Sequence, residues 1–360
     1  MKQILLVAGV DYEFTGVDFR SLADNRLKLL DRKNTKHDDL RFITMDVRSG
    51  EVVVREITFP GGKRAENTKT TTPFTPVGRT SYATNARGQT RFKPGQYTVM
   101  SITDVYAKVR DIGATDPGSL TELSIFSHGW MGGPILVDSD DDRQIQISVP
   151  VPGLPPVIVT VAVTGTARDP DDKDGRPQLD FIAPQMDAAA LKQFKDAFAN
   201  DGFAWLWGCA FPQVIHHALW AMEGAKAYKS SGVGDDTVLD MPAVTSADVD
   251  YLEKILAPKL GTFPSRTSIS VKFKYLKWAF CVANQSCYAF ALATAAGVGV
   301  RAAPLGTYAE YDTAGDHLMN VYSGFTAHFT FYKNYLGFTF DPEGRRYAIY
   351  KPSLSCPAPP

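Results

Sequence analysis

Two apolar runs in this sequence end at residues that can do nucleophilic chemistry. The run LSIFSHG, residues 123–129, ends with His128, and the run FAWLWGC, residues 203–209, ends with Cys209. In open parallel sheets the carboxyl ends of the strands line the ligand site. Two adjacent strands would therefore bring an imidazole and a thiol to one edge, where the imidazole can take up a proton and the thiolate can attack. The pattern predicts a cysteine nucleophile and its base.

A glycine follows the histidine, and an acid follows the first apolar run. Gly129 leaves its backbone N–H sterically open, so this amide and that of Cys209 could together donate to the oxyanion of a tetrahedral intermediate. A peptide carbonyl would suit such a site. Asp11 ends the apolar run of residues 3–10 and is a candidate for the wall of the substrate pocket.

These two motifs resemble the signatures of the caspase-like cysteine peptidases, the group of caspases, legumain, gingipains and clostripain. The resemblance implies that His128 is the catalytic histidine, that Cys209 is the nucleophile and that the Gly129 amide lies in the oxyanion hole. It also implies a three-layer αβα sandwich with a mostly parallel sheet, and a peptide or protein substrate. Two departures stand out: Cys209 precedes Ala-Phe-Pro, and the motifs are 209 − 128 = 81 residues apart, which requires an insertion.

The C-terminal third offers a second set of candidates. Cys287 lies near the start of the Ala-rich helix expected over 286–296, where the helix dipole would favour a thiolate. His317 and Asp341 follow on expected strands, with Asp341 orienting the imidazole. This order resembles a transglutaminase-type core, which implies a thiol acyltransferase. A further alternative is a catalytically silent binding module of the same fold.

Other polar clusters favour structural roles. His216 and His217 are adjacent on an expected helix and point in different directions, so they do not form a metal site. The acidic stretches 138–142 and 169–174 hold carboxylates, the ligands that Ca²⁺ prefers, but they lack the EF-hand spacing. We expect no cofactor, with calcium as the one ion to test. The segment SHGWMGGP resembles the oxyanion segment of α/β-hydrolases, yet the chain holds no G-x-S-x-G elbow.

The elements that must position these residues alternate between strands and helices. Hydrophobic periodicity predicts a β-α-β-β start, a strand after each helix of the core, and an α/β class. Gly113 is expected to end the helix that begins near residue 101. We predict one caspase-like α/β domain over 1–310 and a β-rich extension of it over 311–360. Within the domain we expect a surface loop over 67–97, a β-hairpin insertion over 134–183, a helix over 187–201 and a helical insertion over 212–260.

Composition excludes several classes of protein. The chain has 360 residues, of which 44% are hydrophobic and 21% charged, as in ordinary globular proteins. Lys and Arg number 38 and Asp and Glu 39, so the net charge of −1 gives no attraction to nucleic acid. We therefore expect no nucleic-acid partner and no membrane span.

Four cysteines are too few for a disulfide scaffold, and each is expected to be a single thiol. The N-terminal run MKQILLVAGVDYE is too short for a signal peptide. We expect a cytoplasmic protein, or one exported without a cleavable signal.

Overall fold

The computed structural model describes most of the chain. The residues outside it are 87, 94, 96–97, 141–143, 150–156, 163–165, 168–176, 230–231, 314 and 357–359. Between 140 and 178, the description is limited mainly to backbone elements. Most of the acidic positions considered for calcium, 141–142 and 169–174, lie outside the described residues.

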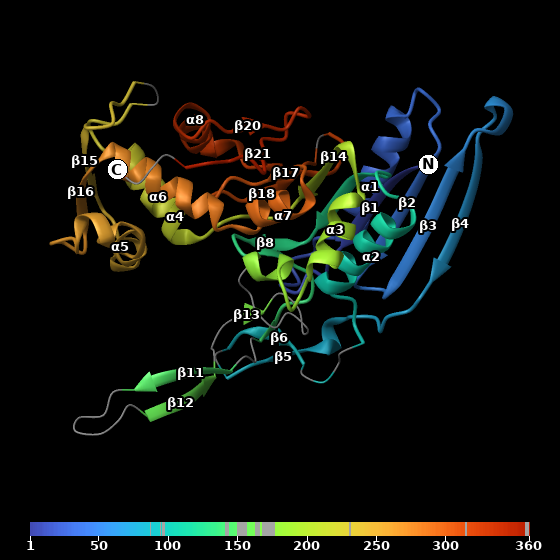
Figure 1. Ribbon diagram of the computed structural model, residues 1–360, viewed down its shortest axis with the longest axis horizontal. Coiled ribbons are helices and arrows are strands. Elements are labelled where there is room, and N and C mark those ends of the chain that lie inside the picture. The colour runs from blue at the N-terminus through green and yellow to red at the C-terminus, as the bar shows by residue number, and fades with distance from the viewer. Residues whose placement is uncertain are drawn as a thin grey trace.

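A nine-stranded mixed sheet forms the centre of the molecule, so the α/β class is confirmed (Figure 1). Five neighbouring strands are parallel, and antiparallel strands extend the sheet at both edges. The expectation of a mostly parallel sheet therefore holds for the centre only. The order is β20 (Thr339–Phe340), β21 (Ala348–Tyr350), β17 (Gly299–Ala302), β14 (Phe198–Leu206), β7 (Leu120–Phe126), β1 (Lys2–Ala8), β2 (Leu40–Asp46), β3 (Glu51–Thr58), β4 (Ala65–Thr71).

Helices cover both faces of the parallel strands and make an α/β sandwich. Helix α1 (Phe19–Lys33) packs on β1, β2 and β7. Helices α2 (Ile102–Thr115), α3 (Ala188–Asp196) and α7 (Tyr288–Ala296) lie on the opposite side (Figure 1). Six consecutive residues of β1 are buried, which explains why its sequence is continuously apolar. Among the helices of the described residues, none has the length and apolar character needed to cross a membrane.

Gly113 does not end its helix, contrary to the sequence prediction. It lies inside α2 and is buried where α3 crosses. A Cβ built on Gly113 would stand 1.8 Å from the Gln193 carbonyl oxygen, so the glycine permits a close helix crossing. The helix continues to Thr115.

The long stretch 67–97 is not an unstructured loop. It contains most of β4, whose seven residues are all exposed, together with the hairpin of β5 (Tyr82–Thr84) and β6 (Thr90–Phe92). An edge strand that buries no side chain has no apolar periodicity, which is why the sequence did not indicate it. After β7 the chain forms a run of short strands: β8 (His128–Trp130), β9 (Gly133–Ile135), β10 (Ser139–Asp140), β11 (Gln144–Val149), β12 (Val157–Ala162) and β13 (Thr166–Ala167). The hairpin of β11 and β12 projects from the body (Figure 1).

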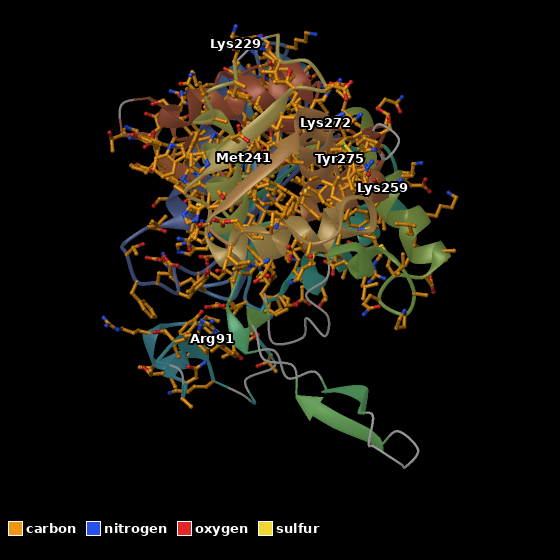
Figure 2. All side chains as sticks on the ribbon, turned by 90° about the vertical axis from the view of Figure 1, so that its left-hand side faces the viewer. Arg91, Lys229, Met241, Lys259, Lys272 and Tyr275 are labelled. Carbon is orange, nitrogen blue, oxygen red and sulfur yellow. A yellow bond between two sulfur atoms is a disulfide. The ribbon has the colours of Figure 1, made fainter. Side chains whose placement is uncertain are left out.

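The helical insertion extends further than predicted and includes a hairpin. Strands β15 and β16 pair antiparallel and pack with the helices around them (Figure 2). The C-terminal extension is not purely β, because α8 lies within it; its strands β20 and β21 join the central sheet. These elements are α4 (Gln213–Glu223), β15 (Val238–Pro242), α5 (Ser246–Leu260), β16 (Ser268–Lys272), α6 (Phe273–Gln285), β18 (Ala309–Tyr311), β19 (Met319–Val321) and α8 (Thr326–Tyr335).

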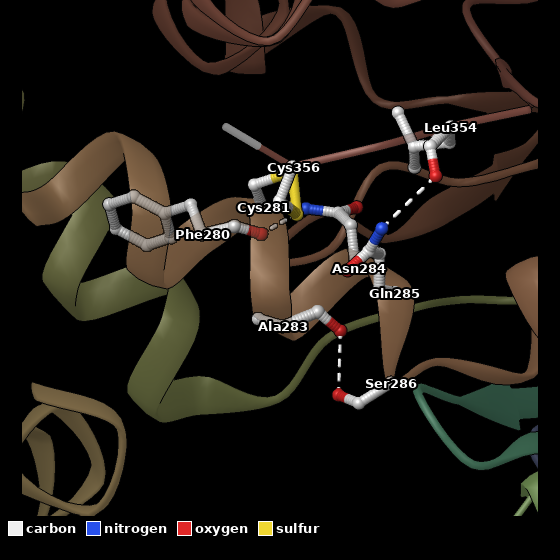
Figure 3. Close-up of a disulfide and its surroundings, with 8 residues drawn as sticks. All are labelled: Phe280, Cys281, Ala283, Asn284, Gln285, Ser286, Leu354 and Cys356. Atoms are coloured by element: carbon white, nitrogen blue, oxygen red, sulfur yellow. Dashed lines mark hydrogen bonds between the residues drawn. A yellow bond between two sulfur atoms is a disulfide. The ribbon is translucent and has the colours of Figure 1, made fainter. Parts of the chain in front are cut away.

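Two of the four cysteines form a disulfide, so the prediction of four single thiols is wrong. Cys281 on α6 is bonded to Cys356 in the C-terminal tail, with their Cα atoms 5.6 Å apart (Figure 3). The Gln285 amide also donates to the Leu354 carbonyl. No sequence pattern indicated this pair, because its members lie 75 positions apart. Cys209 and Cys287 remain free thiols.

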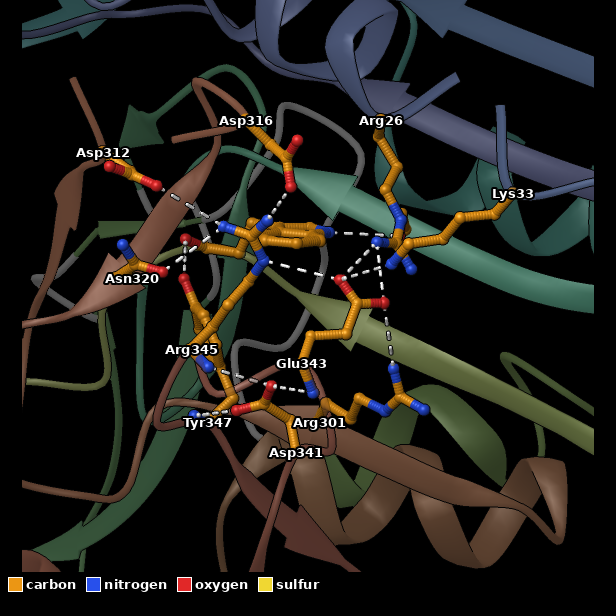
Figure 4. Close-up of polar contacts among 12 residues, drawn as sticks. Arg26, Lys33, Arg301, Asp312, Asp316, Asn320, Asp341, Glu343, Arg345 and Tyr347 are labelled. Carbon is orange, nitrogen blue, oxygen red and sulfur yellow. Dashed lines mark hydrogen bonds and ion pairs between the residues drawn. The ribbon is translucent and has the colours of Figure 1, made fainter. Parts of the chain in front are cut away.

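A cluster of charged side chains links the C-terminal segment to α1 through ion pairs (Figure 4). The buried guanidinium of Arg26 makes two hydrogen bonds of 2.8 Å to Glu122 of β7. It also contacts Glu343, which follows β20, at 2.8 and 2.9 Å. Arg345 extends the cluster to Asp316 at 3.0 Å. The Arg26 side chain lies over the buried rings of Trp205 and Trp207.

Candidate functional site

The ends of three neighbouring parallel strands bring the candidate residues to one edge of the sheet. Asp11 follows β1, His128 follows β7 and Cys209 follows β14. The backbone continues the sheet pairing close to these residues, since Gly9 N–H donates to the Phe126 carbonyl at 2.8 Å and Trp207 N–H donates to the Ile125 carbonyl at 3.0 Å. This arrangement is the one that the sequence predicted for His128 and Cys209.

The His128 ring is held on three sides. Its Nε2 lies 2.9 Å from Oδ1 of Asp11. The Tyr12 ring packs against it with centroids 4.7 Å apart, and the Phe19 ring meets it edge-on at 5.2 Å. Because Nε2 faces the carboxylate, Nδ1 is the nitrogen left to exchange a proton with a thiol. The sequence suggested Asp11 as a pocket-wall residue, and the structure makes it the partner of this ring.

The Asp11 carboxylate also organises the loop between β1 and α1. Oδ2 accepts the backbone N–H of Gly16 at 2.7 Å and of Val17 at 3.1 Å, and the Thr15 hydroxyl donates to the same carboxylate. Burial acts to raise the pKa of Asp11, but the hydrogen bonds from His128 and the Gly16 amide outweigh it and hold the pKa below its ordinary value. An ionised Asp11 can stabilise an imidazolium when His128 accepts a proton.

Cys209 lies beside the segment that follows β17. Its side chain is partly buried, and Sγ lies 3.9 Å from the carbonyl oxygen of Ala309, to which it donates. Burial raises the pKa of the Cys209 thiol, and the charge of Glu13 acts in the same direction. Within the described residues no hydrogen bond joins Sγ to the His128 ring. In enzymes, catalytic contacts are often longer in the free protein than in the substrate complex.

Two glycines let the strand ends approach each other. A Cβ on Gly208 would stand 2.5 Å from the Ser127 carbonyl oxygen and 3.2 Å from the Gly129 nitrogen. A Cβ on Gly129 would stand 3.1 Å from the Cys209 carbonyl oxygen. The chain therefore needs small residues at both positions if the His128 and Cys209 backbones are to lie side by side.

The Gly129 amide is available on the side away from β9. Gly129 lies opposite Pro134 in the β8–β9 hairpin. Because Pro134 has no N–H, these two residues cannot exchange a pair of backbone hydrogen bonds. The Gly129 nitrogen lies near the Gly208 backbone instead. No acceptor for the Cys209 N–H is found among the described residues. The two amides belong to neighbouring backbone segments, since a Cβ on Gly129 would stand 3.8 Å from the Cys209 nitrogen.

A pocket opens next to this pair, between the ends of β7, β14 and β17 and the start of α7. His128, Gly129 and Cys209 line it, as does Cys287. The other walls are mainly apolar. Pockets with apolar walls and a few polar groups are typical of ligand sites.

The second set of candidates is not brought together. Cys287 is buried at the start of α7, and burial raises the pKa of its thiol to about 12. The exposed His317 ring stacks on Tyr311. The Asp341 carboxylate accepts three backbone amides from its own turn. Within the described residues no contact joins Cys287, His317 and Asp341 to one another.

The adjacent histidines of α4 take part in separate contacts, as their directions on a helix required. Nδ1 of His216 lies 3.1 Å from Nε2 of His328, whose Nδ1 lies 2.8 Å from Glu223. His217 instead faces Asp248 at 3.5 Å. No group of three or more metal-ligating side chains with suitable placement is present in the described part of the chain.

Sequence reasoning missed the groups that position the candidate pair. The segment after β17 contributes the Ala309 carbonyl, and Ala210 N–H donates to Thr307 of the same segment at 3.1 Å. Both contacts are made by backbone carbonyls, which any residue carries, so no sequence signal pointed to them. Tyr12 and Phe19 could have been noticed, because both lie near the acid that ends the first strand.

Comparisons of this chain with protein-family models, with curated proteins and with solved structures found no match.

Proposed function

We propose that this protein is a cysteine peptidase in which Cys209 attacks a peptide carbonyl and His128 acts as the base. The observation that carries the proposal is the position of His128 and Cys209 at the ends of adjacent parallel strands, with Asp11 on the far nitrogen of the imidazole. We also propose that the α/β sandwich is caspase-like, since both motifs of that group end neighbouring strands. The substrate class is a peptide or protein.

The chemistry follows from the placement of these groups. Sγ of Cys209 gives its proton to Nδ1 of His128 and bonds to the carbonyl carbon, while the Gly129 and Cys209 amides donate to the oxygen. The imidazolium then protonates the departing nitrogen as the C–N bond breaks, leaving a thioester. Water attacks this thioester with His128 as base, and the acid and the free thiol are released. Asp11 stabilises the charged ring in both steps.

The acyltransferase alternative has less support. Cys287 is buried with a raised thiol pKa, and Asp341 is occupied by its own turn. A buried thiol in apolar surroundings is unreactive.

The disulfide is informative about the cellular compartment in which the protein works. Disulfides persist mainly in oxidising environments. We therefore propose that the protein functions in an oxidising compartment, because Cys281 and Cys356 are bonded.

Hydrolysis of a peptide library, read by mass spectrometry, tests the proposal directly. Wild-type protein, Cys209→Ala, His128→Ala and Cys287→Ala are compared. We expect the first two substitutions to abolish cleavage and Cys287→Ala to retain it. Cleavage that survives in Cys209→Ala and disappears in Cys287→Ala would move the active site to Cys287.

Labelling with iodoacetamide shows whether His128→Ala is inactive because it lacks the base or because it is unfolded. It is done without reductant, so that Cys281 and Cys356 stay bonded. Cys209 should label before Cys287, and at pH above 9 it should still label in His128→Ala. A wild-type protein that cleaves nothing and whose Cys209 resists alkylation would instead be a silent binding module.

A further inference from the structure

The pocket beside Cys209 has walls without charge. It lies between β7, β14, β17 and the start of α7, and Cys209 and His128 are among its lining residues. Among the described residues, no Lys, Arg, Asp or Glu lines it. The apolar side chains of the walls include Ile125, Leu206, Ala302, Ala303, Leu305 and the buried Cys287.

The hydroxyl groups in the wall already have partners. Ser127 Oγ donates to the His128 carbonyl at 2.7 Å. The Tyr350 hydroxyl donates to Asn284 at 3.1 Å, and the Tyr288 hydroxyl lies 2.8 Å from that of Tyr106. A charged or strongly polar group entering the pocket would lose water without gaining a matching partner, which is unfavourable.

The pocket is also small. The cavity volume is about 30 Å³. A cavity that admits benzene is about 150 Å³, so this space suits a small aliphatic group and not an aromatic ring or a guanidinium. Leu305, which is 1% exposed, helps to close the space.

Resting on the proposed function, we infer that this pocket receives the side chain of the residue whose carbonyl Cys209 attacks, and that it selects a small uncharged side chain, alanine above all. Gly129 and Cys209 both line the pocket, and their backbones lie close together. A substrate whose oxyanion occupies those two amides directs its adjacent side chain into the same space. Leu305 is then a residue that determines specificity.

A panel of peptidyl chloromethyl ketones tests the selection on the wild-type protein. The thiolate displaces chloride from the reagent and forms a thioether, which mass spectrometry locates at Cys209. The panel varies only the residue next to the ketone: Gly, Ala, Val, Asp, Arg or Phe. We expect alanine to react about fourfold faster than glycine, because one added methyl is buried. Asp, Arg and Phe should react at least about 100-fold more slowly than alanine.

A matched pair of variants tests the role of Leu305. Leu305→Ala enlarges the pocket and should shift the preference from alanine towards valine by about tenfold, the usual effect of a methylene in an apolar pocket. Leu292→Ala is the control, because Leu292 is equally buried but does not line the pocket. Its preference should match the wild type.

The possible failures are distinct. A faster reaction with the Asp or Arg reagent would overturn the inferred selection and leave the peptidase intact. An unchanged preference in folded Leu305→Ala would overturn the role of that residue. If no ketone and no iodoacetamide reacts at Cys209, the proposed function fails and the inference fails with it.

Discussion

At the scale of single residues, the contact between Asp11 and His128 decides how the imidazole is used. The carboxylate forms a hydrogen bond with Nε2, so in the proposed mechanism Nδ1 is the nitrogen that exchanges a proton with the thiol. Asp11→Asn keeps the size of the side chain and removes its charge, so it can no longer stabilise an imidazolium. We expect kcat/KM for peptide hydrolysis to fall at least about tenfold, within the range of general-base effects.

Matched measurements separate that effect from a folding defect. Asp11 also accepts the Gly16 and Val17 amides, so the variant could loosen its loop. Thr15→Val is the control, since it removes the hydroxyl donor to Asp11 and leaves the His128 contact. Asp11→Asn with full activity and an unchanged melting temperature would show that the carboxylate has no part in the reaction.

The raised pKa of Cys209 makes a second prediction at this scale. Burial favours the neutral thiol in the folded protein, so the thiolate forms only above the ordinary thiol value of 9.0. The rate of iodoacetamide labelling at Cys209 should therefore keep rising above pH 9, where a free cysteine peptide levels off. Because the thiol pKa is higher in the folded protein than in the unfolded chain, the stability that the neutral thiol contributes is present below pH 9 and is lost at higher pH. A plateau near neutral pH would reveal a resting thiolate instead.

At the scale of elements, the crossing of α2 and α3 depends on Gly113. A Cβ there would meet the Gln193 carbonyl at 1.8 Å, so the helices must move apart to admit it. We expect Gly113→Ala to lower the free energy of unfolding by about 1–3 kcal/mol, despite the better helix propensity of alanine. Urea denaturation measures this change in the free energy of unfolding. Gly78→Ala is the control, because nothing lies within 4 Å of its Cβ position, and it should change stability little.

The elements also show what the sequence could predict. Buried parallel strands such as β1 and β7 are continuous apolar runs, so their pattern revealed them and the residues that end them. Strand β4 buries nothing and left no pattern. Gly113 was taken as a helix end because sequence does not distinguish a glycine that stops a helix from one that admits a neighbour. The oxyanion amides could be anticipated, whereas the Ala309 carbonyl depends on tertiary folding alone.

At the scale of the whole molecule, the charged cluster at Arg26 links the C-terminal segment to the sheet. Glu343 is partly exposed and pairs with Arg26, which keeps Glu122 as a second partner. We expect Glu343→Gln to cost about 1–3 kcal/mol, less than the loss of a fully buried pair. Glu66→Gln is the control, because its pairs with Arg55 and Arg64 are exposed and should contribute less than about 1 kcal/mol.

The same carboxylate should make stability depend on pH. Burial opposes ionisation of Glu343, but the charge and hydrogen bonds of Arg26 outweigh it and lower the pKa below its ordinary value of 4.5. A lowered pKa gives stability that is present above pH 4.5 and is lost as the pH falls below it. Glu343→Gln should therefore flatten the decline of melting temperature on the acid side. If the melting temperature of Glu343→Gln declined with acid as steeply as that of the wild type, the Glu343 carboxylate would make no such contribution to stability.

The disulfide acts on the molecule as a whole by restricting the unfolded chain. It closes a segment of 75 residues between α6 and the tail. Chain-entropy reasoning gives such a closure about 4 kcal/mol of stabilisation. Cys281→Ala with Cys356→Ala should lower the melting temperature measured without reductant, and a reductant should then have little further effect. The variant Cys209→Ala with Cys287→Ala retains the disulfide and should lose stability only when a reductant is added. If both proteins melt alike with and without reductant, the tail is held by its noncovalent contacts, and the argument for an oxidising compartment fails with the bond.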